Sequence, residues 1–229
     1  ILRPGAIVII AGEPNCGKTT FMLRTVKMLE AEKKRGVIHP EGYNKKNIYP
    51  EGPINYINSE MREVELIARV ESMGSNIQEW EQWVNFYKRN HSFHQRVSPD
   101  SLNLIDYLEV VSDYTEAGRL ILQLHEKLKT GVAIIGLQKN PKSQLGYGGG
   151  PTLQKPRLYI NLKRNLPHGF IAEAVKVKEA RDFRNKIEGM EIDYHITEDG
   201  QFVPDSGWRY VNEKQRTAIN ADYSRKYRK

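Results

Sequence analysis

The sequence predicts an α/β fold with a mostly parallel central sheet, helices on both faces and an antiparallel hairpin near its C-terminal end. Short apolar runs at 6–11, 102–105 and 132–137, the first of them rich in β-branched residues, are typical of strands buried on both faces of a sheet. They alternate with segments 19–33 and 115–129, where apolar residues recur at helical spacing. Such alternation predicts parallel strands joined by crossover helices.

The remaining elements follow from the same patterns. The pattern of residues 54–58 predicts a further strand, and that of residues 62–72 predicts a helix after it. Residues 76–94 fit a helix or a strand, and glycine, proline and asparagine in residues 34–53 predict a long loop. Later in the chain we expect strands at 158–162 and 171–177, an irregular glycine-rich loop over 144–154, and a hairpin over 190–203 that turns at Asp199-Gly200.

We expect one folded domain over residues 1–211 and a charged tail over residues 212–229. The tail has no convincing apolar face, which predicts a flexible segment or a solvated helix. Because the chain begins at Ile1 and its first predicted strand follows almost at once, we also expect a domain cut from a longer protein.

Composition narrows the class of protein. The 229 residues carry a formal net charge of +7, and 39% of them are hydrophobic, which is enough for a core. The basic excess favours a polyanionic partner such as nucleic acid, although a merely basic surface would give the same charge. The single cysteine excludes an internal disulfide framework and fits a reducing cytosol. No apolar run approaches the ~20 residues of a membrane span, so we expect a cytoplasmic protein.

A phosphate-binding loop follows the first predicted strand. The segment Gly12-Glu13-Pro14-Asn15-Cys16-Gly17-Lys18-Thr19 matches G-x-x-x-x-G-K-[ST] between a strand and a helix, the context that this motif requires. Its backbone N–H groups and the helix N-terminus would hold phosphate, Lys18 would neutralise the outer phosphates, and the Thr19 hydroxyl would ligate Mg²⁺. Thr20 completes the expected nucleotide-binding segment. Cys16 is better explained as a small packing residue than as a redox group.

Two carboxylates lie where further predicted strands end. Asp106 follows the strand over 102–105, as a metal-supporting aspartate does, although an aspartate at a strand end is often only a turn former. Glu60 follows the strand over 54–58 and could orient an attacking water. An acidic residue at a helix start explains Glu60 equally well from its spacing alone.

An amide and a basic loop follow the strand over 132–137. Gln138 could contact a γ-phosphate and sense its loss. The glycine-rich loop after it carries Lys139, Lys142 and Tyr147, which suit a sugar–phosphate backbone and a stacked base. A surface loop without a ligand remains the alternative.

Together these residues resemble the RecA-like ATPase core of DnaB-type replicative helicases, and most closely the phage and mobile-element versions. The resemblance covers about residues 2–203. Four motifs carry it. Arg3-Pro4-Gly5 and residues 11–20 resemble the family's entry strand and Walker A motif, and Ser59-Glu60-Met61 resembles its Ser-Leu-Glu-Met segment with one residue fewer. Ile105-Asp106-Tyr107-Leu108 resembles the Walker B signature, and Leu137-Gln138-Lys139-Asn140 resembles the third helicase motif.

The resemblance assigns roles to individual residues. It implies that Glu60 is the catalytic glutamate and that Gln138 is the glutamine of the third motif. The family also has a late Lys-x-Arg pair that reaches the neighbouring subunit's γ-phosphate. This sequence departs from that pattern, so either Lys176 with Lys178 or Lys178 with Arg181 could fill the role.

The resemblance further implies an ATP-hydrolysing, Mg²⁺-dependent motor domain that translocates on single-stranded DNA during replication. It implies a homo-oligomeric ring, expected to be a hexamer, with a primase or other replication domain fused to it or partnered with it. If the protein is phage-encoded, it would act in the host cytoplasm. The alternatives are a RecA-like recombinase, a plasmid-replication accessory ATPase without unwinding activity, or a nucleotide-controlled switch.

Overall fold

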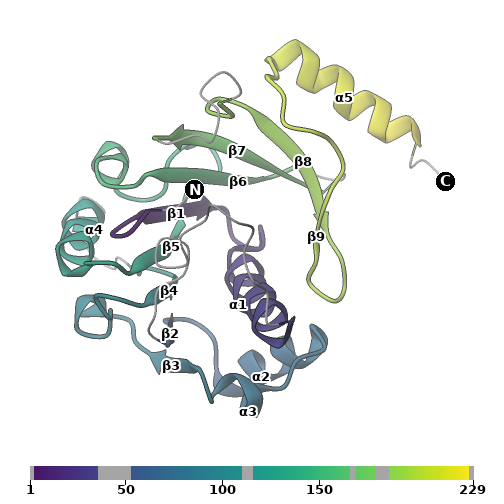
Figure 1. Ribbon diagram of the computed structural model, residues 1–229. Coiled ribbons are helices and arrows are strands. Elements are labelled where there is room, and N and C mark those ends of the chain that lie inside the picture. The colour runs from purple at the N-terminus through teal and green to yellow at the C-terminus, as the bar shows by residue number, and fades with distance from the viewer. Residues whose placement is uncertain (1–2, 36–52, 110–115, 166–168, 179–185, 227–229) are drawn as a thin grey trace.

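The computed structural model describes residues 3–35, 53–109, 116–165, 169–178 and 186–226. In this part of the chain nine strands form one sheet, in the order β3-β2-β4-β5-β1-β6-β7-β8-β9 (Figure 1). The predicted long loop at 34–53 lies almost wholly outside the described residues. The predicted α/β architecture, with its parallel sheet and C-terminal hairpin, is confirmed.

The first half of the sheet is parallel. Its strands are β1 (Ile7–Gly12), β2 (Ile54–Asn58), β3 (Val84–Lys88), β4 (Leu102–Asp106), β5 (Val132–Gln138) and β6 (Leu158–Arg164). Every residue of β1, β2 and β4 is buried, and β1 is apolar throughout, as expected for a strand covered on both faces. The carboxyl ends of these strands all reach the same edge of the sheet, which we call the carboxyl edge.

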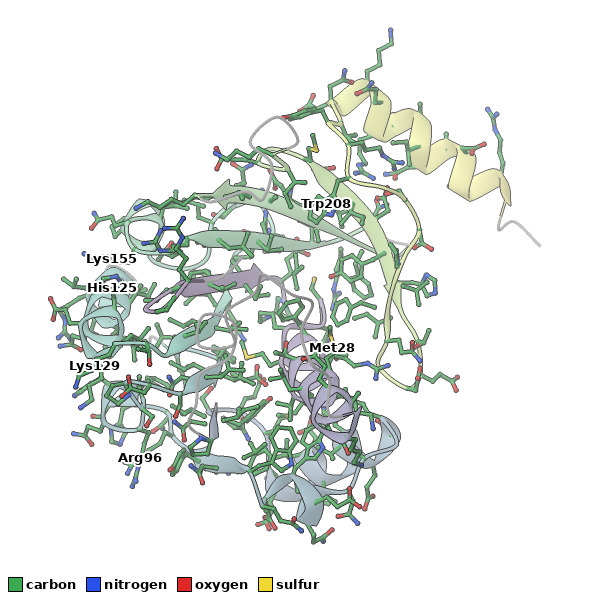
Figure 2. The ribbon with its side chains drawn as sticks, in the orientation of Figure 1. Met28, Arg96, His125, Lys129, Lys155 and Trp208 are labelled. Atoms are coloured by element: carbon green, nitrogen blue, oxygen red, sulfur yellow. The ribbon has the colours of Figure 1, made fainter. Side chains whose placement is uncertain are left out.

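Helices cover both faces of the sheet. On one face lie α1 (Lys18–Arg35), α2 (Glu63–Ser72) and α3 (Ile77–Trp80), and on the other lies α4 (Glu116–Lys127). Alternate residues of the strands pack into two separate hydrophobic clusters, one beneath each layer of helices. Side chains fill the space between the sheet and both layers (Figure 2).

The ambiguous region at 76–94 contains both a helix and a strand. The Asn76 side chain accepts a hydrogen bond from the Gln78 backbone N–H at 2.8 Å and so caps the short helix α3. Trp80 is fully buried at the end of α3, and its indole N–H donates to the Glu30 carboxylate at 3.3 Å. The chain then enters β3, which pairs with β2 at the edge of the sheet.

The second half of the sheet is antiparallel. It is formed by β7 (Phe170–Val177), β8 (Glu191–Ile196) and β9 (Phe202–Pro204), which follow β6 in spatial order. The predicted turn at Asp199-Gly200 joins β8 to β9, and Gly200 has a positive φ of 74° that favours glycine. Two 3₁₀ turns, η2 (Phe93–Gln95) and η3 (Gly150–Leu153), lie in the connections before β4 and β6.

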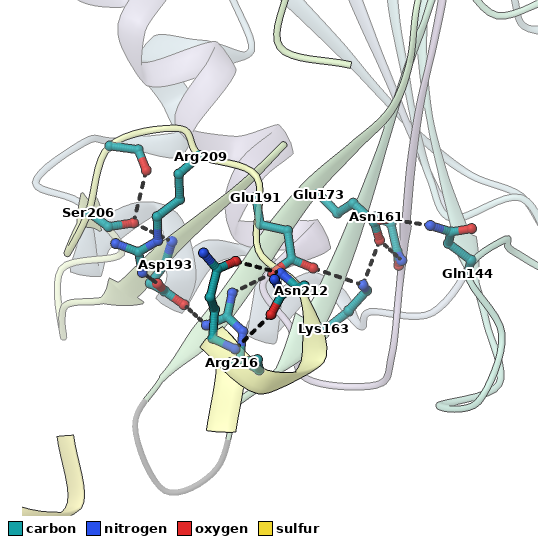
Figure 3. Close-up of polar contacts among 12 residues, drawn as sticks. Gln144, Asn161, Lys163, Glu173, Glu191, Asp193, Ser206, Arg209, Asn212 and Arg216 are labelled. Atoms are coloured by element: carbon teal, nitrogen blue, oxygen red, sulfur yellow. Dashed lines mark hydrogen bonds and ion pairs between the residues drawn. The ribbon is translucent and has the colours of Figure 1, made fainter. Parts of the chain in front are cut away.

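The C-terminal segment forms a helix, α5 (Glu213–Lys226), that projects from the body of the protein (Figure 1). Its first turns are attached to β8, because Arg216 forms ion pairs with Glu191 and with Asp193, the latter at 2.6 Å. A polar network continues from there across β7 to Gln144 (Figure 3). The solvated helix was one of the two predictions for this tail.

We predict that Leu104→Ala will lower the free energy of unfolding by about 2–5 kcal/mol, because it leaves a cavity beneath a central strand. Leu104 is fully buried in β4, whereas Val64 on α2 is 79% exposed. Val64→Ala is therefore the matched control and should change stability little. Urea unfolding of both variants measures the difference, and equal effects would contradict this account of the core.

Candidate nucleotide-binding site

The phosphate loop connects β1 to α1 in the predicted position. Asn15 and Gly17 have positive φ values of 60° and 86°, which turn the backbone so that it curls around a concave space. The Lys18 ammonium donates hydrogen bonds to the carbonyl oxygens of Gly12 at 3.0 Å and Glu13 at 2.9 Å. Burial lowers the pKa of Lys18. A phosphate group nearby would raise that pKa again, because its negative charge favours the protonated ammonium.

The loop borders a pocket of about 380 Å³, which is within the size range of small-molecule sites. Glu60 and Gln138, two residues predicted from other strands, also line this pocket. The predicted segment contributes Pro14, Asn15, Gly17, Lys18, Thr19 and Thr20 to its wall. The sheet therefore brings together residues that are far apart in the sequence.

Cys16 and Glu13 do not line the pocket. Cys16 is fully buried, and burial raises the pKa of its thiol, which agrees with a packing role. The Cys16 carbonyl accepts a hydrogen bond from the Tyr194 hydroxyl of β8 at 3.0 Å. Glu13 lies 3.4 Å from the ammonium of Lys139.

Asp106 joins the phosphate loop to two strands. Its Oδ1 accepts a hydrogen bond from the Thr19 hydroxyl at 3.1 Å, and its Oδ2 accepts one from the Tyr56 hydroxyl at 2.6 Å. Burial raises the pKa of Asp106, while these two hydrogen bonds act in the opposite direction. A hydroxyl and a carboxylate side by side are the hard oxygen donors that Mg²⁺ prefers, so these residues fit the predicted metal.

Glu60 lies on a turn that Asn58 holds in place. The Asn58 side-chain oxygen accepts hydrogen bonds from the backbone N–H groups of Glu60 at 3.0 Å and Met61 at 2.9 Å. Its side-chain nitrogen donates to the Met61 carbonyl at 2.8 Å. Glu60 itself is exposed at the pocket, and α2 begins three residues later at Glu63. The carboxylate is thus available to a water in the pocket.

The loop after Gln138 presents its predicted residues in different ways. Lys142 is exposed and Tyr147 is half-buried, with the Tyr147 backbone N–H bonded to the Gln138 carbonyl at 2.8 Å. Lys139, however, is only 2% exposed, and its ammonium donates to the Ser143 carbonyl at 2.8 Å. With its charge directed at Glu13 and its own loop, Lys139 supports the phosphate loop and does not face an external DNA strand.

Two of the basic residues predicted to act on a neighbouring subunit, Lys176 and Lys178, lie away from this pocket. Lys178 follows the end of β7 and is exposed. Lys176 donates a hydrogen bond to the Leu153 carbonyl at 2.5 Å, which directs it toward its own chain. Arg181 lies outside the described residues. Since Val177 pairs with Leu158 at the start of β6, Lys178 lies at the edge opposite the phosphate loop and cannot reach its own pocket.

Three features of the site and its support were not anticipated from the sequence. Arg69 and Glu65 on α2 line the pocket and form an ion pair at 2.9 Å, which their spacing of four residues on a helix could have indicated. The Tyr56 hydroxyl donates a hydrogen bond to Asp106. This contact could be expected only if β2 and β4 were known to be neighbours. Ile196, at the end of β8, also lines the pocket.

The C-terminal hairpin packs directly against the phosphate loop. A Cβ added at Gly17 would lie 2.4 Å from Ile196 and 3.1 Å from Phe202, so the Ile196 side chain would have to shift, and the positive φ of Gly17 also favours glycine. Arg24 on α1 donates a hydrogen bond to the Gly200 carbonyl at 2.9 Å, which ties the hairpin turn to the helix. The hairpin therefore supports the loop that would bind phosphate.

Comparison with known proteins agrees with the fold. No protein-family model matches the chain, and no curated protein matches it in sequence. Among solved structures, a KaiC-like protein from the hyperthermophilic archaeon Pyrococcus horikoshii superimposes with a TM-score of 0.63 and 17% identity, over 90% of this chain and 91% of that chain. At this identity the likeness shows a RecA-like fold and nothing of the activity, which must be argued from the site.

No described helix is long and apolar enough to cross a membrane.

We predict that Tyr56→Phe will raise the Mg²⁺ concentration needed for half-maximal nucleotide hydrolysis by roughly tenfold. The substitution removes one hydrogen bond to a charged group, worth about 1.5–3 kcal/mol, and leaves Asp106 free to rotate away from Thr19. Tyr87→Phe on the edge strand β3 is the control. A magnesium titration of the hydrolysis rate tests this, and a parental titration curve for Tyr56→Phe would show that Tyr56 does not position Asp106.

Proposed function

We propose that this chain is the ATP-hydrolysing motor domain of a DnaB-type replicative helicase, which translocates on single-stranded DNA. The observation that carries the proposal is the pocket in which Lys18, Thr19, Glu60 and Gln138 come together beside Asp106. A fold shared by 513 matching solved chains would not by itself define an activity. The helicase assignment rests on the pocket together with the four sequence motifs that resemble this family.

ATP would lie with its phosphates in the curl of the loop. Lys18 would exchange its bonds with the Gly12 and Glu13 carbonyls for bonds with the outer phosphate oxygens. Thr19 and Asp106 would hold Mg²⁺, which when bound neutralises charge on the phosphates. Arg69, held by a solvent-exposed ion pair that stabilises it only weakly, could turn from Glu65 toward the nucleotide at little cost.

Hydrolysis requires a water placed in line with the terminal phosphate. Glu60 would accept a proton from this water or orient it, with its backbone held by the Asn58 side chain. Gln138 ends β5 in the same pocket, and the Tyr147 backbone donates to its carbonyl. Loss of the γ-phosphate at the Gln138 amide would therefore be transmitted to the loop that carries Lys142 and Tyr147.

A ring, proposed to be a hexamer, would complete the site. Lys178 lies at the edge of the sheet opposite the phosphate loop, so head-to-tail packing of copies could bring it to a neighbour's nucleotide. Arg181 remains its proposed companion from the sequence. Single-stranded DNA and a primase or other replication domain are the partners that accompany this proposal.

A RecA-like ATPase without unwinding activity is the second candidate. The likeness in fold to a KaiC-like protein over nearly the whole chain favours it. Stimulation of ATP hydrolysis by single-stranded DNA would separate a DNA motor from a nucleotide switch. A forked-duplex unwinding assay on the full-length protein would then separate a helicase from a recombinase or a plasmid-replication accessory ATPase.

Lys18→Ala is expected to abolish ATP hydrolysis and weaken ATP binding while leaving the fold intact, because no other residue supplies its charge inside the loop. Lys214→Ala, on the exposed face of α5, is the control and should behave as the parent. Phosphate release and binding of a fluorescent ATP analogue measure the two effects. Parental hydrolysis by Lys18→Ala would show that the site is wrongly assigned.

Glu60→Gln should bind ATP normally but hydrolyse it more slowly, by about 10²–10⁴-fold, because an amide cannot accept the proton. The exposed Glu63 in the first turn of α2 offers a matched control. If Glu60 only favours the start of the helix, Glu60→Gln and Glu63→Gln will lower the thermal midpoint alike and leave turnover unchanged. Single-turnover hydrolysis and thermal melts of both variants distinguish the two roles.

A further inference from the structure

Four basic residues lie at the edge where the parallel strands begin, which we call the amino edge. The start of β6 lies between the start of β1 and the end of β7, since Leu158 pairs with both Val8 and Val177. The helix α4 also ends at this edge, just before β5 begins. The four residues, which we call the amino-edge cluster, are His125, Lys155, Arg157 and Lys178.

The members of the cluster lie close enough to influence one another. Burial and then the charges of Lys155, Arg157 and Lys178 lower the pKa of His125, with Glu126 the nearby carboxylate that opposes them. Backbone bonds fix their segments together, because the Lys178 N–H donates to the Arg157 carbonyl at 2.8 Å and the Arg157 N–H donates to the Ile7 carbonyl at 2.9 Å. The cluster is therefore built on the sheet itself.

The charge of its two lysines is poorly compensated. In the part of the chain that the structure describes, neither Lys155 nor Lys178 forms an ion pair, and Lys155 and His125 are half-buried. Holding like charges together and partly out of water raises the free energy of the protein, and a bound polyanion would offset that cost. This distinguishes the cluster from lysines scattered on a solvated face.

The basic surface extends beyond these four residues. Figure 2 shows Lys155, His125, Lys129 and Arg96 in succession along one side of the protein. Lys129 is exposed in the turn between α4 and β5. The segment from Gln138 to Lys155 leads from the carboxyl edge to the amino edge, so the loop with Lys142 and Tyr147 connects the nucleotide pocket with this surface.

We propose that Lys155 and Arg157 of the amino-edge cluster, together with Lys129 and Arg96, bind the phosphate backbone of a single-stranded nucleic acid, while Lys178 keeps its proposed role toward a neighbouring copy's nucleotide. A six-residue strand separates this surface from the phosphate loop, a distance of about 20 Å at ~3.3 Å per residue. The surface is therefore separate from the nucleotide pocket. The proposal rests on the proposed function only in taking DNA as the partner, and it adds a second contact beyond the loop after Gln138.

The test compares DNA binding by the parent chain with that of the double variant Lys129→Gln/Lys155→Gln. Fluorescence anisotropy with a labelled oligothymidylate at several salt concentrations gives the slope of log affinity against log salt. Because each lost phosphate contact lowers this slope by about 0.7 on single strands, we expect a decrease of about 1.4. Lys88→Gln/Lys214→Gln, two exposed lysines on β3 and α5, should leave the slope unchanged.

Fluorescent ATP-analogue binding and a thermal melt, measured on the same samples, show that the variants are folded and keep the nucleotide pocket. A parental slope and affinity in Lys129→Gln/Lys155→Gln would overturn the cluster as a DNA contact while leaving the proposed function intact. Loss of ATP hydrolysis with an unchanged slope would overturn it too, and would assign the cluster to a neighbouring copy's nucleotide. No DNA binding by the parent chain would contradict both proposals.

Discussion

Parallel pairing of the central strands determines where the candidate site residues lie. Gly12 at the end of β1 pairs with Gln138 of β5, and Asn58 at the end of β2 pairs with Asp106 of β4. A slip of one residue in either pair would turn these side chains to the opposite face of the sheet. The pocket therefore depends on the register of the strands, which the two hydrophobic clusters on either face hold in place.

Asp106 holds several parts of the site together. It is buried and would be costly to ionise alone, but Thr19 from α1 and Tyr56 from β2 each donate a hydrogen bond to it. The phosphate loop is held from the other side by the hairpin, through the close contacts of Gly17 with Ile196 and Phe202. Movement of a bound nucleotide would therefore alter contacts with both the sheet and the hairpin.

Much of the fold and the core of the site could be predicted from the sequence, because they depend on local patterns. Apolar runs indicate buried strands. Two glycines and a lysine between a predicted strand and a predicted helix indicate the phosphate loop. The region 76–94 was ambiguous because a four-residue helix and an edge strand follow one another there, and neither is long enough to establish a period.

What the sequence could not reveal depends on tertiary contacts. Lys139 follows Gln138 and looks like a surface lysine in a basic loop, yet the opposing Glu13 and the Ser143 carbonyl draw it inward. Tyr56 looks like any buried strand residue until Asp106 lies beside it. The gathering of Lys155 and Lys178 beside His125 likewise requires knowing which strand neighbours which.

We propose above all that the loop between β1 and α1 binds the phosphates of ATP, with Mg²⁺ held by Thr19 and Asp106. A crystal structure with a non-hydrolysable ATP analogue and Mg²⁺ tests it most directly. We expect the Lys18 ammonium to leave the Gly12 and Glu13 carbonyls for the outer phosphates, and the Thr19 hydroxyl to contact the metal. An analogue bound outside this pocket, with Lys18 still on those carbonyls, would contradict it.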